Sequence, residues 1–455
     1  MSHEFHPSSL REYDIRGIVG RTLGVEDATA IGRCFATLLR RAGGTRVVVA
    51  RDGRVSSPEM EAALVKGLTA SGVDVVRIGL APTPMLYYAE AMLEVDGGIQ
   101  ITGSHNPADY NGFKMVMQHR PFFGDDIARL GKMAAAGEWD DGEGSVSDHD
   151  FTDAYVGRLV AGYAGGSYRI GWDTGNGAAG PVIEALVRHL PGEHHLLYTD
   201  VDGHFPNHHP DPTEEQNLAD LQRLVAEKQL DFGLAFDGDG DRIGAVDGRG
   251  RVLWGDQLLA ILAEPALRET PGATIIADVK ASQALFDRIA ELGGVPLMWK
   301  TGHSPMKTKL RETGAPLAAE MSGHIFFGGD DHGFDDAPYG AVRLIRAIHL
   351  SGRSLTELRD AMPEMVNTPE LRFKVGEERK FAVVEEVLAR LQAARAEVDT
   401  TDGARVTTAD GWWLLRASNT QDVLTARAEA RDEAGLARLL AEVDAQLAAS
   451  GVVRG

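Results

Sequence analysis

One serine lies in a segment whose residue types suit nucleophilic chemistry. The segment reads Ile101-Thr102-Gly103-Ser104-His105-Asn106-Pro107, and Lys114 follows the serine by ten residues. A hydroxyl with a base or a cation nearby can attack an electrophile and carry a chemical group on its oxygen. Serine, asparagine and proline are also common in turns, so the segment taken alone fits an ordinary turn equally well.

A second segment, Asp237-Gly238-Asp239-Gly240-Asp241-Arg242, follows the apolar run 232–236. Its alternating carboxylates can converge on one hard cation, and oxygen ligands suit Mg²⁺ or Ca²⁺. An EF-hand loop begins in the same way, but it requires glycine and glutamate at positions that Arg242 and Gly248 occupy here. A solvated acidic turn is the other alternative. Arg242 favours the metal site, because a guanidinium beside a cation can hold a phosphoryl oxygen.

Two later segments offer groups that could bind a phosphorylated sugar. In Glu320-Met321-Ser322-Gly323-His324 the carboxylate and hydroxyl would point the same way along an extended chain and straddle neighbouring sugar hydroxyls. Helix capping would explain these residues as well. The segment Arg416-Ala417-Ser418-Asn419-Thr420 gathers a guanidinium, hydroxyls and an amide, which suit a phosphate monoester. A Ser-Asn turn with a surface arginine is its alternative.

Three further polar segments follow predicted strands or contain clustered histidines. Lys280 and the segment Lys300-Thr301-Gly302-His303-Ser304 could each be a solvated loop end, although His303 could also exchange a proton near neutral pH. The segment 204–212 has the composition of a metal cluster. Its prolines and adjacent histidines instead predict a stiff loop near the mouth of an active site, without a metal.

Alternating strands and helices must position these segments. Apolar, β-branched runs followed by turns and helical patterns predict βα units in three regions, with strands at 47–50, 75–78, 98–102, 168–173, 232–236, 274–279 and 296–300, and helices at 57–71 and 282–292. The repeated alternation predicts three related α/β units. Open α/β sheets bind ligands beyond the carboxyl ends of their strands, which is where most of the polar segments begin.

The pattern changes after residue 365 to a strand at 371–375, helices at 381–394 and 433–449, and a hairpin-like stretch between the helices. This order predicts a smaller α+β unit. A chain of 455 residues is also too long for one hydrophobic core. We therefore predict domains at 1–150, 151–252, 253–365 and 366–455, and the Gly- and Asp-rich segment 137–144 supports the first boundary.

The composition indicates a folded globular protein, since 43% of the residues are hydrophobic and 25% are charged. A formal net charge of −21 argues against non-specific binding to nucleic acid or to an anionic membrane. The sequence has neither a signal-peptide pattern at its start nor a membrane-spanning apolar run. Its single cysteine, Cys34, lies in a predicted helix and is expected to pack in a core. We expect a cytoplasmic protein.

Taken together and in this order, the polar segments closely resemble the motifs of the α-D-phosphohexomutase superfamily over nearly the whole chain. The motifs are the N-terminal Arg11-Glu12-Tyr13-Asp14-Ile15-Arg16-Gly17, the phosphoserine loop at 102–107, the metal loop at 237–242, the sugar-binding loop at 320–324 and the phosphate-binding loop at 416–420. Details such as Lys-Thr-Gly-His-Ser at 300–304 are most similar to the bacterial phosphomannomutase/phosphoglucomutase branch. Phosphoglucosamine mutases usually have glutamine at the position of Met321, and many relatives have proline at the position of Asp422.

The resemblance implies three related α/β domains and a smaller C-terminal α+β domain around a central cleft. It also implies an enzyme that moves a phosphoryl group reversibly between the 1- and 6-positions of mannose or glucose phosphates. Phosphorylated Ser104 and a hexose 1,6-bisphosphate would be the intermediates, and one Mg²⁺ would be held by Ser104, Asp237, Asp239 and Asp241. A phosphoglucosamine mutase and a phosphoserine-forming sugar phosphatase are the alternatives. The expected partner is a small phosphosugar, and the expected assembly is a monomer or a weak homo-oligomer.

Residue roles follow from the same resemblance. The implied catalytic residues, besides Ser104, are His105, Lys114, Arg16, Arg242 and His303. Which of Lys114, Arg16 and His303 acts as the general base or acid remains open. The implied substrate contacts are Tyr13, Lys280, Thr301, Gly302, Glu320, Ser322, His324, Arg416, Ser418, Asn419 and Thr420.

Overall fold

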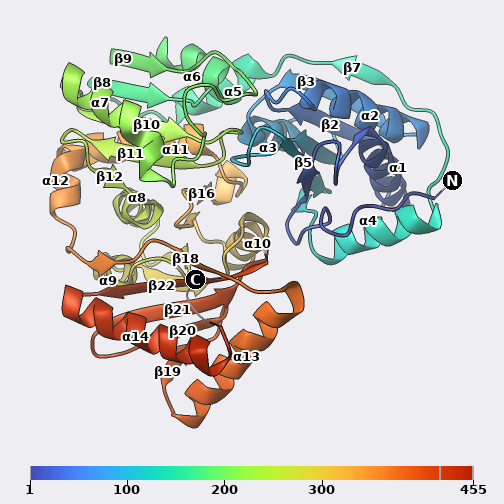
Figure 1. Cartoon of the computed structure of the whole chain (residues 1–455). Coiled ribbons are helices and arrows are strands. Elements are labelled where there is room, and N and C mark those ends of the chain that lie inside the picture. Colours follow the sequence, from blue (N-terminus) through green and yellow to red (C-terminus); the bar gives the residue numbers. More distant parts are fainter. Residues whose placement is uncertain (1, 420–421, 453–455) are drawn as a thin grey trace.

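Four β-sheets follow one another along the chain, and helices pack around them (Figure 1). The computed structural model describes residues 2–419 and 422–452. Within these ranges no helix combines the length and the apolar character that crossing a bilayer requires. The predicted fold class, a multidomain α/β protein with a smaller α+β unit at its C-terminus, is confirmed.

The first sheet has the strand order β1-β5-β4-β2-β3-β7, with β6 paired to β5. Its buried central strand β2 contains the run Val47–Val49 and pairs in parallel with β3 and β4, whereas β5 is antiparallel to β4. The strands are β1 (Ile15–Ile18), β2 (Arg46–Arg51), β3 (Asp74–Leu80), β4 (Gly97–Ile101), β5 (Tyr110–Met117), β6 (Arg120–Pro121) and β7 (Val146–Asp148). The helices are α1 (Val25–Arg41), α2 (Ser57–Ala70), α3 (Thr83–Met92) and α4 (Asp125–Ala136). Cys34 is buried in α1, as predicted.

The second sheet has the order β12-β11-β10-β8-β9 and the third has the order β14-β13-β15-β16. The second contains β8 (Tyr168–Asp173), β9 (Gly192–Leu197), β10 (Phe232–Phe236), β11 (Ile243–Asp247) and β12 (Val252–Leu253), with α5 (Thr152–Ala161), α6 (Gly180–Val187), η1 (Glu215–Leu218) and α7 (Ala219–Lys228). The third contains β13 (Thr274–Asp278), β14 (Val295–Trp299), β15 (Leu317–Ala319) and β16 (Ile325–Phe327), with α8 (Gly255–Glu269), α9 (Gln283–Glu291), α10 (His303–Thr313), η2 (Gly329–Asp331), α11 (Ala337–Ser351) and α12 (Leu355–Asp360).

The fourth sheet is antiparallel and has the order β17-β22-β21-β20-β19, with β18 also paired to β22. It contains β17 (Val366–Asn367), β18 (Leu371–Lys374), β19 (Glu397–Asp399), β20 (Ala404–Thr407), β21 (Gly411–Ala417) and β22 (Val423–Ala430). Helices α13 (Glu377–Ala393) and α14 (Glu433–Ala449) pack on it (Figure 1, orange and red). The predicted α+β tail is therefore present.

The hydrophobic cores show which units are joined tightly. One large cluster runs from the first sheet through Trp172 of the second to Ile275 of the third. The fourth sheet has a core of its own and meets the third through a small cluster that includes Val279 and Trp412. The first three units thus share buried surface, whereas the fourth is attached by a smaller contact. Three of the sheets lie within one predicted domain range each, whereas Leu253 of β12 in the second sheet falls one residue beyond the predicted boundary at 252. A sheet does not locate a boundary, so the boundaries stay predictions.

Candidate active site

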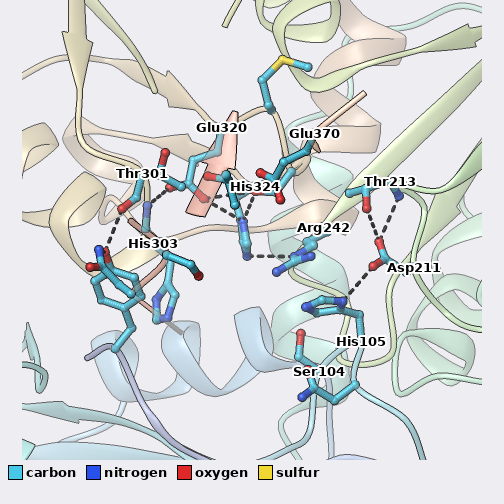
Figure 2. A pocket seen from close by; sticks show the side chains of 18 of the residues that line it. Ser104, His105, Asp211, Thr213, Arg242, Thr301, His303, Glu320, His324 and Glu370 are labelled. Carbon is cyan, nitrogen blue, oxygen red and sulfur yellow. Dashed lines mark hydrogen bonds and ion pairs between the residues drawn. The ribbon is translucent and has the colours of Figure 1, made fainter. Parts of the chain in front are cut away.

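The four polar loops of the sequence all connect neighbouring antiparallel strands. Ser104 lies between β4 and β5, the three aspartates between β10 and β11, Glu320 between β15 and β16, and Ser418 between β21 and β22. One cleft of about 830 Å³ is lined by residues from all four loops. Figure 2 shows its centre, where Ser104 and His105 face Arg242 and the side chains of His324 and Glu320 lie beyond.

Ser104 is held in a left-handed backbone conformation, with a φ of 50°. This conformation costs a residue with a Cβ atom about 1–2 kcal/mol, so the surrounding loop must stabilise it. The Ser104 amide donates to Thr102 Oγ1 over 2.7 Å, and its Oγ donates to Asp237 Oδ2 over 3.0 Å. A Cβ atom on Gly238 would lie 2.5 Å from the Ser104 carbonyl oxygen, so only glycine permits this contact between the loops. The hydroxyl is therefore aimed at the aspartate loop.

Asp237, Asp239 and Asp241 lie behind Ser104 with no exposed surface, and they present carboxylate oxygens within 4.8 Å of one another. Oδ1 of Asp239 has no hydrogen-bond partner among the described residues, and Oδ1 of Asp241 lies 3.3 Å from His324 Nε2. Burial and the neighbouring carboxylates raise the pKa of Asp237 well above its ordinary value. A hard cation would bind the unpartnered oxygen of Asp239 and would offset the repulsion among the three carboxylates, so the three residues fit a metal site.

Lys114 reaches the same aspartates from β5. Its Nζ donates to Asp239 Oδ2 over 2.8 Å and also to Asp241. Burial lowers the pKa of Lys114, but the two carboxylates outweigh burial and raise the pKa above its ordinary value. Of the two roles left open for this lysine, proton acceptor and charge partner, the ion pairs favour the second.

Arg242 continues the aspartate loop into the cleft. Its Nε lies 3.4 Å from His324 Nε2, and its guanidinium faces His105, whose Nδ1 is 2.8 Å from Asp211 Oδ2 (Figure 2). Burial and the charge of Arg242 lower the pKa of His105 to about 4, despite Asp211. Burial lowers the pKa of His324, but the Asp241 carboxylate outweighs it and raises the pKa to about 9. The two histidines thus favour opposite protonation states at neutral pH.

The backbone around Glu320 forms a turn, which corrects the expectation of an extended segment. The Gly323 amide donates to the Glu320 carbonyl over 3.0 Å, because Gly323 takes a left-handed φ of 87° that an extended strand lacks. Ser322 Oγ therefore folds back and donates to Glu320 Oε2 over 3.2 Å. The carboxylate also accepts from the Gly302 amide and lies 3.0 Å from His324 Nδ1. Both side chains still line the cleft.

His303 is the first residue of α10 and lines the cleft, so it is not part of a solvated loop end. Burial and the positive charges of Lys307 and Lys114 lower its pKa well below the ordinary value. A neutral imidazole can accept a proton but has none to spare as an acid at neutral pH. Its ring lies edge-on to that of Tyr13, at 6.0 Å between centroids.

The far end of the cleft is rich in cationic and amide groups. Arg416 donates to Asp402 from Nε over 3.0 Å, Asn419 Nδ2 donates to the Tyr13 hydroxyl over 2.6 Å, and that hydroxyl donates to the Thr301 carbonyl over 2.9 Å. Lys280 lies 3.5 Å from Glu370, which also lines the cleft. Thr420 lies outside the described residues. The Asp422 carbonyl accepts from the Val375 amide over 3.1 Å, which ties the loop to the strand beside it.

Apart from Thr420 and the buried aspartates, every predicted site residue lines this one cleft: Tyr13, Arg16, Ser104, His105, Lys114, Arg242, Lys280, Thr301, Gly302, His303, Glu320, Ser322, His324, Arg416, Ser418 and Asn419. The sequence analysis missed Asp211, Glu370, Arg372 and Arg427, which line it too. Asp211 belongs to the histidine-rich segment that was placed near an active-site mouth. Arg427 lies within β22, where no loop pattern marks it.

Comparisons with known proteins match nearly the whole chain. Four domains described as phosphoglucomutase/phosphomannomutase alpha/beta/alpha domains I, II and III and C-terminal domain match residues 8–138, 153–250, 254–366 and 370–446. A phosphomannomutase/phosphoglucomutase of Pseudomonas aeruginosa is 43% identical, over 95% of this chain and 94% of its own length. A phosphoglucomutase of Neisseria gonorrhoeae is 41% identical, over 94% of each. The crystal structure of a family protein from Burkholderia thailandensis, also 43% identical, superposes with a TM-score of 0.92 over 98% of both chains.

Proposed function

The chain belongs to the phosphoglucomutase/phosphomannomutase family, and from that premise we propose that its phosphoryl carrier is Ser104. The enzyme is a mutase that moves a phosphoryl group within a hexose phosphate. One observation carries the proposal for the carrier. Ser104 Oγ contacts the carboxylate loop at one end of a cleft whose other end presents Arg416 and Asn419. One phosphate of a sugar can react at Ser104 while a second is bound at the far end.

In the first transfer, the bond between phosphorus and Ser104 Oγ breaks and a bond from phosphorus to a substrate hydroxyl oxygen forms. The proton of the substrate hydroxyl passes to a base, and the serine oxygen takes up a proton as it is released. In the second transfer Ser104 Oγ gives up that proton as it attacks the other phosphorus of the bisphosphate, and the sugar oxygen that leaves is protonated. His303 is the candidate base, because it lines the cleft and its lowered pKa leaves the imidazole neutral and able to accept a proton at neutral pH. Lys114, Arg242 and Arg16 supply positive charge around the transferring group, and His105 lies beside Ser104.

Asp237, Asp239 and Asp241 would hold a Mg²⁺ ion together with an oxygen of the Ser104 phosphoryl group. When bound, the ion would neutralise charge on the transferring phosphoryl group. The residues themselves keep water out of this region, since none of the three side chains is exposed. Lys114 compensates part of their charge through its two ion pairs.

The product of the first transfer is a hexose 1,6-bisphosphate, which must reverse its orientation before the second transfer. Arg416, Ser418, Asn419 and Lys280 would bind whichever phosphate is remote from Ser104. Glu320 and Ser322 would bind hydroxyls that the two orientations present in similar positions, with His324 beside them. The cleft volume of about 830 Å³ lies in the range of about 300–1,000 Å³ that small-molecule sites occupy.

An isomerisation assay tests the proposal directly. The purified protein with Mg²⁺ and a trace of glucose 1,6-bisphosphate should convert glucose 1-phosphate and mannose 1-phosphate to the 6-phosphates. Release of inorganic phosphate should stay below a few per cent of isomer formation. Phosphate release in excess of isomer would instead identify a sugar phosphatase, and a preference for glucosamine 1-phosphate would identify a phosphoglucosamine mutase. Wild-type protein should also carry phosphate on Ser104 in a mass spectrum.

Removal of the Arg416 guanidinium should weaken substrate binding. A hydrogen bond to a charged group contributes about 1.5–3 kcal/mol, so Arg416→Met should raise KM for glucose 1-phosphate roughly 10- to 100-fold. We expect kcat to change less than KM, because this group lies at the end of the cleft away from Ser104. Arg438→Met is the matched control, since Arg438 lies in the same unit but is paired with Asp410 at the surface. An unchanged KM for Arg416→Met would exclude this arginine from phosphate binding.

A further inference from the structure

Arg54 binds the backbone of the Ser104 loop but does not itself line the cleft. Its side chain has no exposed surface, and it is not among the residues that line the cleft. All five N–H groups of its guanidinium are used. Nη2 donates to the carbonyls of Ser104 and Asn106 over 2.7 and 2.6 Å, Nη1 donates to those of Pro107 and Tyr110 over 2.5 and 2.9 Å, and Nε donates to Asp52 over 3.2 Å.

The four accepting carbonyls belong to one short segment, residues 104–110. Their dipoles point at a common centre, which is unfavourable unless a cation with divergent donors occupies that centre. A planar guanidinium supplies five fixed donors, whereas an ammonium group supplies only three. Residue 103 must be glycine for this arrangement, because a Cβ atom there would lie 2.4 Å from the Arg54 guanidinium carbon.

Asp52 fixes the guanidinium in turn and ties the start of the same loop. It accepts from the Arg54 amide over 3.0 Å as well as from Nε. It also accepts from Thr102 Oγ1 over 2.8 Å and from the Gly103 amide over 3.2 Å. The Thr102 hydroxyl then accepts from the Ser104 amide. Arg54 and Asp52 therefore bind both sides of Ser104.

Residues of the second unit of the chain pack against Arg54. The ring of Phe205 lies 5.2 Å from the Arg54 guanidinium carbon, and a Cβ atom on Gly203 would lie 2.6 Å from the Arg54 Cα atom. Packing this close excludes water, which could otherwise replace the missing donors if the guanidinium were removed. The Arg54 side chain is thus the group that binds the four carbonyls of the loop, beside the bonds that Asp52 makes to its start.

We infer that Arg54 is the positioning residue that keeps Ser104 in its left-handed conformation with Oγ aimed at the aspartate loop. The inference rests on the proposed role of Ser104 as phosphoryl carrier. Loss of the guanidinium would release the carbonyls of residues 104–110 and let the hydroxyl move from its place beside Asp237. A displacement of about 1 Å at a reacting group can cost about 100-fold in rate.

Steady-state kinetics of Arg54→Lys and Arg54→Met test the inference. We expect kcat for glucose 1-phosphate to fall about 30- to 100-fold in Arg54→Lys and further in Arg54→Met, with KM changed by less than about threefold. Arg51→Met is the matched control, because Arg51 is the last residue of β2, three positions before Arg54, but pairs with Glu61. Its kcat should remain within about twofold of wild type. Amide hydrogen exchange should accelerate in the peptide that covers residues 103–112 in the Arg54 variants only.

The outcomes separate the two hypotheses. If wild-type protein neither isomerises the sugar phosphate nor takes up label from ³²P-glucose 1,6-bisphosphate, the proposed function fails. If wild type does both and folded Arg54→Lys keeps a normal kcat, the positioning role of Arg54 is overturned. A rise in KM with normal kcat would overturn it as well. Should Arg54→Met fail to fold, Arg54→Lys decides, with its circular dichroism and melting temperature as the check on folding.

Discussion

Replacement of Ser104 by alanine should abolish isomerisation of glucose 1-phosphate while the protein remains folded. Its Oγ is the only heavy atom removed, and the one hydrogen bond that Oγ makes to a described residue goes to Asp237. Loss of the nucleophile from a covalent mechanism removes the acceptor of the phosphoryl group, so we expect kcat to fall by at least about 10⁴-fold. The measurement is a coupled assay of glucose 6-phosphate in the presence of glucose 1,6-bisphosphate and Mg²⁺.

Ser71→Ala is the control for removal of a buried hydroxyl. Ser71 lies at the end of α2, is fully buried, and has no hydrogen-bond partner for its hydroxyl within the described residues. We expect that variant to retain wild-type activity and to keep the phosphate found on the wild-type protein. The mass of Ser104→Ala should lack that phosphate. Substantial turnover by Ser104→Ala would rule out the covalent mechanism.

Contiguous sequence patterns predicted the loops of the site because each loop joins two strands that are neighbours in one sheet. Asp237 and Asp241 lie between β10 and β11, so their convergence is fixed by five residues of chain. The cleft itself brings together residues that are far apart in sequence. Tyr13 and Asn419 share a hydrogen bond across 406 positions, a pairing that no local pattern encodes. The resemblance to a known family, not the periodicity, supplied that part of the prediction.

Besides the cleft residues that no loop pattern marks, the sequence did not reveal features that depend on backbone groups, on strand pairing or on the folding of a turn. Arg54 contacts carbonyl groups, which every residue has, so no side-chain motif records its partners. Lys114 was recognised, but its strand β5 was not, and only the pairing of β5 with β4 explains why Nζ reaches the aspartates. The turn at Gly323 was missed because an extended chain and a turn are both compatible with a Ser-Gly pair.

Replacement of Asp239 by asparagine should weaken metal binding and slow the reaction together. Asp239 Oδ1 lacks a hydrogen-bond partner among the described residues, whereas its Oδ2 accepts from Lys114 and Thr83. The amide is a poorer ligand for Mg²⁺ and leaves Lys114 with one carboxylate partner, Asp241. A bound cation contributes several kcal/mol to stabilising a transferring phosphoryl group, so kcat should fall roughly 10³-fold.

A Mg²⁺ titration of activity separates loss of the metal from loss of the fold. In Asp239→Asn the half-saturating Mg²⁺ concentration should rise at least tenfold, and excess Mg²⁺ should restore part of the rate. Asp247→Asn is the control, because Asp247 is equally buried at the opposite end of the β10–β11 hairpin, where it pairs with Arg251. If Asp239 were needed only for folding, Asp239→Asn and Asp247→Asn would both show the half-saturating Mg²⁺ concentration of wild type. Such a result would exclude the aspartate loop as the metal site, because Asp239→Asn changes the residue whose Oδ1 has no other partner among the described residues and is the candidate metal ligand.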